Sequence, residues 1–297
     1  MSFFTVKLIA MIAMLIDHLG LFWDLSMKLS VQKVFWLRAI GRIALPLFAF
    51  NIVNGWQHSS SRENYRNRII NFMAISQIPY NLAFYAGNYY TYLAKSDFFK
   101  INIEIDHKFL ILSIVFLLFN SVNKKTTIGL IAATIFTFID IRSQNNFYFT
   151  YHNYLNVFYT LGAAIYIIDD LDYFKFLRNG ESITGFNDII RAINIFVTAF
   201  LFCYYSDYSF RGLLLIIVLY LLKDHKNLML GTIAIWLFIM YYDPKPYFLL
   251  ISLISVLILY LYNGKKGNAG KSFRMICYYF YPVHLFIIGL LVLFKLF

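Results

Sequence analysis

The chain has 297 residues and a composition that excludes an ordinary soluble domain. It is 60% hydrophobic, 20% aromatic and only 14% charged, whereas soluble domains carry about 25% charged residues. Apolar runs of the roughly 17–25 residues needed to cross a bilayer recur from end to end. The sequence therefore predicts an all-α, polytopic integral membrane protein, with about eleven transmembrane helices in one bundle and a single domain over residues 1–297.

The expected spans follow one another with short connections, and the eighth to tenth are short enough to be tilted, re-entrant or buried. They are centred on residues 5–23, 34–55, 69–87, 108–122, 126–141, 151–169, 188–206, 208–222, 227–242, 246–262 and 274–296. The first span has no small-x-small cleavage site and is interrupted by Asp17 and His18. We therefore expect it to be retained rather than removed as a signal peptide.

The distribution of lysine and arginine sets the expected orientation. Loops after even-numbered spans carry more of these residues, for example Arg62, Arg66 and Arg68 after the second span. Because positively charged loops stay in the cytoplasm, we predict a cytoplasmic N-terminus and an external C-terminus. The net charge of +11 is largely explained by this topology and by contact with anionic lipid headgroups. No long basic run indicates nucleic-acid binding.

Four ionisable residues lie inside the first two expected spans: Asp17, His18, Arg38 and Arg42. Such a group in hydrocarbon costs several kcal/mol unless it pairs or faces a polar cavity, so it marks a functional site by default. Arg38 and Arg42 share a helix face, whereas Asp17 and His18 point about 100° apart and line two walls of one cavity. Two structural alternatives stay open. Asp17 pairs with Arg42 to lock two helices together, and His18 makes only an interhelical hydrogen bond.

Two prolines are placed to free carbonyl groups inside the spans. Pro46 cannot donate to the carbonyl of Arg42, which predicts a kink in the second span. Irregular backbone at membrane depth is tolerated where it lines a cavity. Pro79 lies between Gln77 and Asn81 in the third span. These two amide side chains either contact a substrate or join neighbouring helices.

The last span contains His284, which shares a helix face with Tyr281. It is either a second member of the site or a packing histidine bonded to a tyrosine. Cys203 and Cys277 fall in apolar spans and are expected to behave as small buried hydrophobes. No zinc-binding, nucleotide-binding or serine-hydrolase pattern occurs, so we predict no metal.

Several of these segments resemble the TraX family. The resemblance rests on Lys7-Leu8-Ile9-Ala10, Ile16-Asp17-His18-Leu19-Gly20, the run 37–50, the run 76–84, Tyr262-Asn263-Gly264-Lys265-Lys266-Gly267 and Phe280-Tyr281-Pro282-Val283-His284-Leu285. A weaker segment, Ser206-Asp207-Tyr208-Ser209, resembles an Asp-Tyr-Gly element with serine where glycine is usual. The similarity covers roughly the first and last thirds of the chain.

The resemblance implies a membrane acyltransferase, because TraX proteins are associated with N-acetylation of the conjugative F pilin subunit. They are similar to a wider group that includes heparan-α-glucosaminide N-acetyltransferase and the glycan O-acetyltransferases. A histidine at the end of the first core helix is the usual catalytic candidate in that group, and His18 is the matching residue. The implied donor is cytoplasmic acetyl-coenzyme A. The implied acceptor is a pilin N-terminus or a surface glycan, and the implied location is the bacterial inner membrane.

Acetyl transfer from a thioester needs a base that takes a proton from an amine or a hydroxyl. We expect His18 to be this base and Asp17 to hold its tautomer. The tetrahedral oxyanion needs donors, and the residues expected to contact it or the substrate are Arg38, Arg42, Gln77, Asn81 and His284. Coenzyme A carries phosphates that cations bind, and the residues expected to hold them are Arg62, Arg66, Lys265 and Lys266.

Two interpretations from other functional classes stay open. A transporter or flippase would use the same intramembrane residues to carry protons or bind substrate. A pilus or envelope assembly partner would perform no chemistry. Bound coenzyme A or thioester consumption favours the enzyme, whereas proton-coupled uptake without use of coenzyme A favours the transporter.

Overall fold

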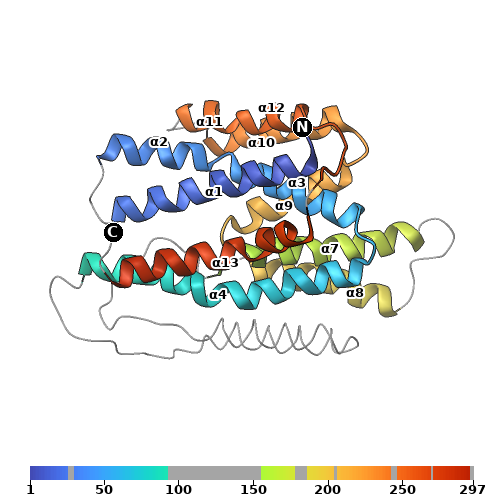
Figure 1. The fold of residues 1–297 in the computed structure, drawn as a ribbon. Coiled ribbons are helices and arrows are strands. Elements are labelled where there is room, and N and C mark those ends of the chain that lie inside the picture. The colour runs from blue at the N-terminus through green and yellow to red at the C-terminus, as the bar shows by residue number, and fades with distance from the viewer. Residues whose placement is uncertain are drawn as a thin grey trace. The chain divides into compact units, whose positions relative to one another are not determined.

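The computed structural model describes residues 1–25, 30–92, 155–177, 186–203, 206–241, 246–268 and 270–294. Within these ranges every regular element is a helix, which confirms the all-α prediction. The helices are α1 (Phe3–Leu25), α2 (Val31–Gly41), α3 (Ala44–Gln57), α4 (Arg62–Tyr92), α7 (Val157–Leu177), α8 (Phe186–Cys203), α9 (Ser209–Leu221), α10 (Lys226–Tyr241), α11 (Pro246–Ser252), α12 (Ile254–Tyr260) and α13 (Lys271–Leu293) (Figure 1).

Two helical stretches among the described residues are long and apolar enough to cross a membrane, Phe3–Trp23 and Val31–Gln57. Four shorter apolar helices accompany them: Ser209–Leu221, Lys226–Tyr241, Pro246–Tyr260 and Met275–Leu291. The expected spans 108–122 and 126–141 lie outside the described residues. The number of about eleven spans therefore stays a prediction.

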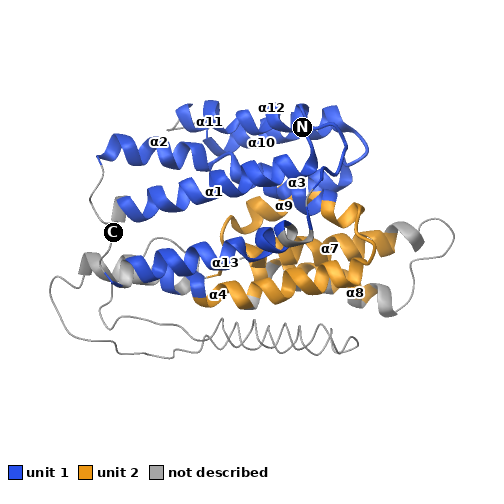
Figure 2. Ribbon diagram, viewed as in Figure 1, with its two compact units in different colours: residues 1–54, 79–97, 218–297 blue, residues 55–78, 98–217 orange. Residues whose placement is uncertain are grey.

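The contacts of the chain group into two compact units (Figure 2). Unit 1 comprises residues 1–54, 79–97 and 218–297, and unit 2 comprises residues 55–78 and 98–217. Unit 1 therefore combines both ends of the chain. In it α1 packs against α2 and α13, while α2 also contacts α11 (Figure 1). In unit 2 α7 packs against α8. The single domain expected from the sequence stays a prediction.

The kink expected at Pro46 is present as a complete break between α2 and α3. Helix α2 ends at Gly41 and α3 begins at Ala44. The last turn of α2 tightens to a 3₁₀ pattern, because the Arg42 amide donates to the Ala39 carbonyl at 3.1 Å. This shift releases the carbonyl of Arg38, which then accepts a hydrogen bond from Nε of Arg42 at 3.1 Å. The freed backbone group is thus satisfied by a side chain.

A turn from the C-terminal part of unit 1 caps the first helix. The first amides of a helix have no intrahelical partner. In α1 the amides of Phe3 and Phe4 donate to the carbonyls of Lys265 and Lys266, at 2.9 and 3.3 Å. Gly267, with a φ of +81°, lies so close to Ser2 that an added Cβ would come within 2.5 Å of its hydroxyl oxygen. The turn that contains Gly267 therefore caps the first turn of α1 and packs closely against it.

Candidate functional site

Close helix packing places Asp17 against α2. A Cβ atom added at Gly41 would lie 2.2 Å from the Cβ atom of Asp17. One added at Gly20 would lie 2.7 Å from the Cβ atom of Leu37. Small residues at a helix crossing let the two backbones approach closely, as is common in membrane helices. Glycine at these two positions is what brings the Asp17 carboxylate within reach of the arginines of α2.

Asp17 binds both arginines of α2. Its Oδ1 atom lies 3.0 Å from Nη1 of Arg38 and 2.9 Å from Nη2 of Arg42. Nη1 of Arg38 also donates to the backbone carbonyl of Asp17 at 3.3 Å. The guanidinium of Arg42 lies over the ring of Phe248 at 5.8 Å from its centroid. The pairing of Asp17 with Arg42 that the sequence left open is therefore present, and Arg38 joins it.

His18 points to a different helix and contacts His284 of α13. Its Nδ1 atom lies 2.7 Å from Nε2 of His284, across 266 residues of sequence. Nδ1 of His284 lies 2.6 Å from the backbone carbonyl oxygen of Phe280. The two imidazole planes differ by 11° and their centroids are 5.0 Å apart. The rings therefore lie side by side in nearly one plane, as an N–H···N bond between them requires.

These contacts fix the neutral tautomers of both rings. A carbonyl oxygen only accepts, so Nδ1 of His284 carries a proton that it donates to Phe280. Its Nε2 then carries a lone pair, and Nδ1 of His18 donates to it. The remaining nitrogen of His18, Nε2, is left unprotonated. No described residue donates a hydrogen bond to it. The outcome is a chain of two imidazoles that ends in a basic nitrogen.

The imidazole pair is buried among aromatic rings. His18 and His284 are 7% and 6% exposed. The ring of Phe84 in α4 meets the His18 ring edge-on at 5.8 Å between centroids, and Tyr281 does so at 6.2 Å. Phe280 lies over His284, with ring centroids 4.8 Å apart. Such walls exclude water and strengthen electrostatic interactions within the site.

The group that orients His18 is therefore His284. The sequence interpretation gave this task to Asp17, but the Asp17 carboxylate is bound to Arg38 and Arg42 instead. Adjacent residues on a helix point about 100° apart, so one helix directs Asp17 to α2 and His18 to α13. His284 was expected to bond a tyrosine or to join the site. Its hydrogen bonds go to His18 and to the carbonyl of Phe280.

Gln77, one of the two amide residues singled out in α4, makes hydrogen bonds within unit 2. Gln77 is 1% exposed, and its Oε1 atom accepts from both the backbone amide and Nδ2 of Asn156, at 3.1 and 2.8 Å. Asn156 also donates to the carbonyl of Met73 and accepts from the amide of Phe158 in the first turn of α7. Gln77 thus joins two helices of unit 2. The side chain of Asn81 lies outside the described residues.

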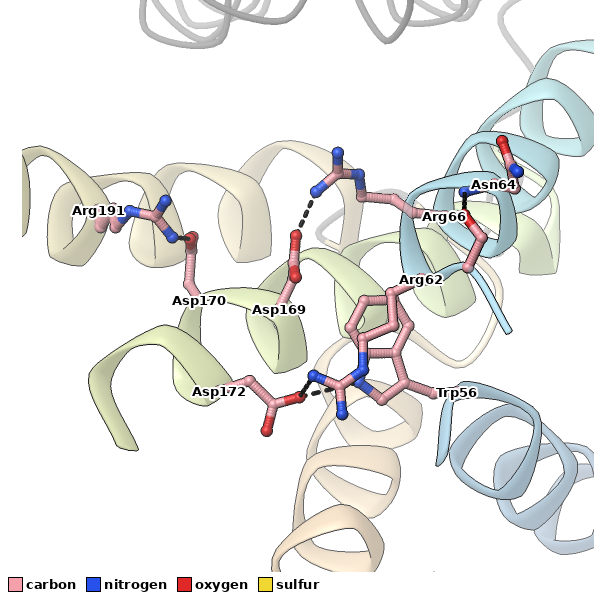
Figure 3. A network of polar contacts seen from close by, with 9 residues as sticks. Trp56, Arg62, Asn64, Arg66, Asp169, Asp170, Asp172 and Arg191 are labelled. Carbon is pink, nitrogen blue, oxygen red and sulfur yellow. Dashed lines mark hydrogen bonds and ion pairs between the residues drawn. The ribbon is translucent and has the colours of Figure 1, made fainter. Parts of the chain in front are cut away.

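The two arginines proposed to bind a cofactor are engaged by carboxylates of α7 (Figure 3). Arg62 pairs with Asp172 at 2.9 Å, and Nε1 of Trp56 donates to the same carboxylate at 3.1 Å. Arg66 pairs with Asp169. Both arginines belong to unit 2, whereas the exposed Lys265 and Lys266 belong to unit 1.

A third ion pair of unit 2 joins α7 to α8. Arg191 donates from Nη1 to Asp170 at 3.0 Å (Figure 3). Its guanidinium also lies 3.6 Å from the ring centroid of Tyr173. Asp170 lies just beyond the expected span 151–169. Burial raises the pKa of its carboxyl to about 6, although the Arg191 charge acts in the opposite direction. The sequence interpretation missed this row of aspartates, whose signal was the acidic run at 169–172 directly after an apolar span.

Comparison with known proteins identifies the family of this chain. The chain matches the family described as "TraX protein" over residues 2–152 and 145–292. It is 38% identical over 80 residues to a protein of Dichelobacter nodosus named "Probable fimbrial assembly protein FimC, serogroup H1". That match covers 27% of this chain and 32% of the relative. No solved structure matches. The family match extends over almost the whole chain, and the protein therefore belongs to the TraX family of membrane proteins.

Proposed function

We propose that this protein is a membrane-embedded acetyltransferase that moves an acetyl group from acetyl-coenzyme A to an amine or hydroxyl acceptor. The observation that carries the proposal is the buried imidazole pair, in which His18 presents an unprotonated Nε2 atom and His284 holds its other nitrogen. A neutral imidazole in this state is a competent general base. A third group that fixes the tautomer is the arrangement found in enzymes with activated nucleophiles.

In the proposed reaction, Nε2 of His18 takes the proton from the acceptor nitrogen or oxygen. The acceptor atom then forms a bond to the thioester carbonyl carbon, and a tetrahedral oxyanion results. Collapse of this intermediate breaks the carbon–sulfur bond, and the thiolate of coenzyme A takes the proton back from His18. The positive charge that His18 carries in between is shared with His284, because the Nδ1 proton of His18 points at Nε2 of His284.

The acceptor that we propose is a pilin N-terminus, with a surface glycan as the second choice. The supporting observation is the similarity to a relative named as a probable fimbrial assembly protein. The donor is expected on the cytoplasmic side of the bacterial inner membrane. Our candidates for contacts with its phosphates remain, each unit taken by itself, Arg62 and Arg66 in unit 2 and Lys265 and Lys266 in unit 1. For the two arginines, this role requires the donor to compete with Asp172 and Asp169.

The test measures acetyl-coenzyme A consumption with a pilin-derived peptide as acceptor. We expect His18→Ala to lower the turnover number by about 10²–10⁴-fold, the usual cost of removing a general base. His284→Ala should also lower turnover, and the pH at which the rate is half-maximal should shift, because the tautomer of His18 is no longer fixed. Donor binding should survive both changes.

His225→Ala is the matched control, because His225 lies in the same unit but is exposed. Its turnover should equal that of the unchanged protein. Full activity of the His18→Ala protein would show that His18 is not the general base. Proton-coupled uptake into vesicles that depends on His18 and His284, with no thioester consumption, would show that the protein is a transporter and not an acetyltransferase.

A further inference from the structure

The guanidinium of Arg38 contacts Asp17 through one of its edges. Its other edge has the geometry to bind two oxygens of an anion. Within the described part of the chain, the side chain of Arg38 forms its ion pair and its hydrogen bond through the Nη1 atom, which contacts Oδ1 and the backbone carbonyl of Asp17. No described residue accepts a hydrogen bond from its Nε or Nη2 atoms. Nε and Nη2 lie on the same edge of the guanidinium plane. Their parallel N–H groups form the fork that binds two oxygens of one phosphate or carboxylate.

The charge of Arg38 is also only partly matched. Its ion-pair partner Asp17 is shared with Arg42 through the same oxygen atom, Oδ1. The C-terminal end of α2 offers a further, weaker compensation through its partial negative charge. A cation in an apolar helix costs free energy unless its charge is neutralised by a partner. Because the single negative charge of Asp17 is shared between two guanidinium groups, the charge of Arg38 is not fully neutralised.

The side chain of Arg38 is more exposed than those of its two partners in the cluster. The side chain of Arg38 is 26% exposed, against 13% for Arg42 and 10% for Asp17. The two contacts of Nη1 to Asp17 also hold the guanidinium in one orientation, so little conformational freedom remains to be lost on binding.

We infer that the Nε–Nη2 edge of Arg38 is a binding site for a phosphate group. The phosphate belongs either to a soluble phosphorylated compound, such as a nucleotide cosubstrate, or to a phospholipid headgroup. Two oxygens of the phosphate accept hydrogen bonds from Nε and Nη2 of Arg38, while Asp17 keeps the guanidinium in place. The inference concerns binding alone and does not depend on acetyl transfer.

The test uses the full-length protein in a maltoside detergent, which contains no phosphate. Inorganic pyrophosphate is titrated in one arm, and phosphatidylglycerol in mixed micelles in the other. Binding is followed as a rise in the midpoint of thermal unfolding, since a ligand that binds only the native state stabilises it. We expect Arg38→Gln to raise the apparent dissociation constant at least about tenfold, the loss expected for charge-assisted hydrogen bonds.

Arg191→Gln is the matched control, because Arg191 has a carboxylate partner to which no second described arginine is recorded as bonded. It should leave binding unchanged. If Arg38→Gln does not fold, Arg38→Lys keeps the charge but removes the planar fork, and it should also weaken binding. Protection by pyrophosphate identifies a soluble phosphate, and protection by phosphatidylglycerol alone identifies a lipid. Protection that is absent in both arms, or equal in the Arg38 variants, would overturn the inference.

Asp17→Asn provides a test with the opposite sign. Asparagine keeps an oxygen that accepts from Nη1, and the backbone carbonyl contact also remains, so the guanidinium stays oriented. Loss of the shared negative charge leaves Arg38 with more unmatched charge, and phosphate binding should become tighter. A purely structural cluster predicts only lower stability and no gain in affinity. Since no acetyl donor is present, failure of this test leaves the proposed acetyl transfer standing. An inactive protein that still binds pyrophosphate through Arg38 would leave the phosphate site standing.

Discussion

Two consecutive residues, Tyr208 and Ser209, have left-handed backbone with φ values of +62° and +45°. This conformation costs a residue with a Cβ atom about 1–2 kcal/mol. The segment is held by its surroundings: the Oγ1 atom of Thr160 donates to the carbonyl of Asp207 at 2.6 Å, and the amide of Asp207 donates to the carbonyl of Leu155 at 3.0 Å. The position where the TraX resemblance leads one to expect glycine is therefore one where glycine is conformationally favoured.

We predict that Ser209→Gly stabilises the protein by about 1 kcal/mol, because glycine adopts positive φ without steric cost. The measurement is the midpoint of thermal or denaturant unfolding in detergent. Ser209→Ala serves as the control, since it removes the hydroxyl but keeps the Cβ atom. Equal effects of the two substitutions would assign the change to the hydroxyl rather than to the backbone.

At the scale of the helices, the contact between α1 and α2 depends on the absence of a side chain at Gly41. An added methyl group would lie 2.3–2.4 Å from the carboxylate atoms of Asp17 and 2.2 Å from its Cβ atom. The contact atoms are close to the α1 backbone and carry an ion pair with two arginines, so they cannot rotate away cheaply. The helices must then separate, and the site geometry is lost with them.

We predict that Gly41→Ala destabilises the protein by at least about 1–3 kcal/mol, the usual cost of overpacking, and that it abolishes acetyl transfer. Gly231→Ala is the control, because nothing lies within 4 Å of an added Cβ atom in the middle of α10. Alanine is the better helix former there by about 1 kcal/mol, so stability should stay equal or rise. Stability is read from denaturant unfolding of both variants. A Gly41→Ala protein of unchanged stability would show that α1 and α2 are not as closely packed as described.

For the whole molecule, the orientation in the membrane follows from lysine and arginine in the loops rather than from any single contact. The test uses a reporter enzyme that is active only outside the cytoplasm. We predict that this reporter is active when it is fused after Phe297. The same reporter fused after Arg178, in a loop expected to be cytoplasmic, should be inactive. Activity after Arg178 and none after Phe297 would mean that the topology is inverted. Equal results at both positions would mean that the span count is wrong by one.

The sequence by itself determined the class of this protein and the positions of its unusual residues. An apolar composition forces every backbone group to be satisfied within helices, so the all-helical fold could be predicted without knowing any contact. The break before α3 is equally local, because Pro46 lacks the amide that Arg42 needs. The cost of an ionisable group in hydrocarbon was enough to single out Asp17, His18 and His284.

Only the tertiary structure decided which of these residues meet. Asp17 was as close in sequence to His18 as a residue can be, yet it binds the arginines of α2, and His18 binds a histidine 266 residues away. The interhelical partner of Gln77 proved to be Asn156. The reason is that the direction of a side chain follows from its own helix, whereas its partner follows from how helices distant in sequence pack. That packing depends on close approaches such as the one at Gly41, which a single sequence does not reveal.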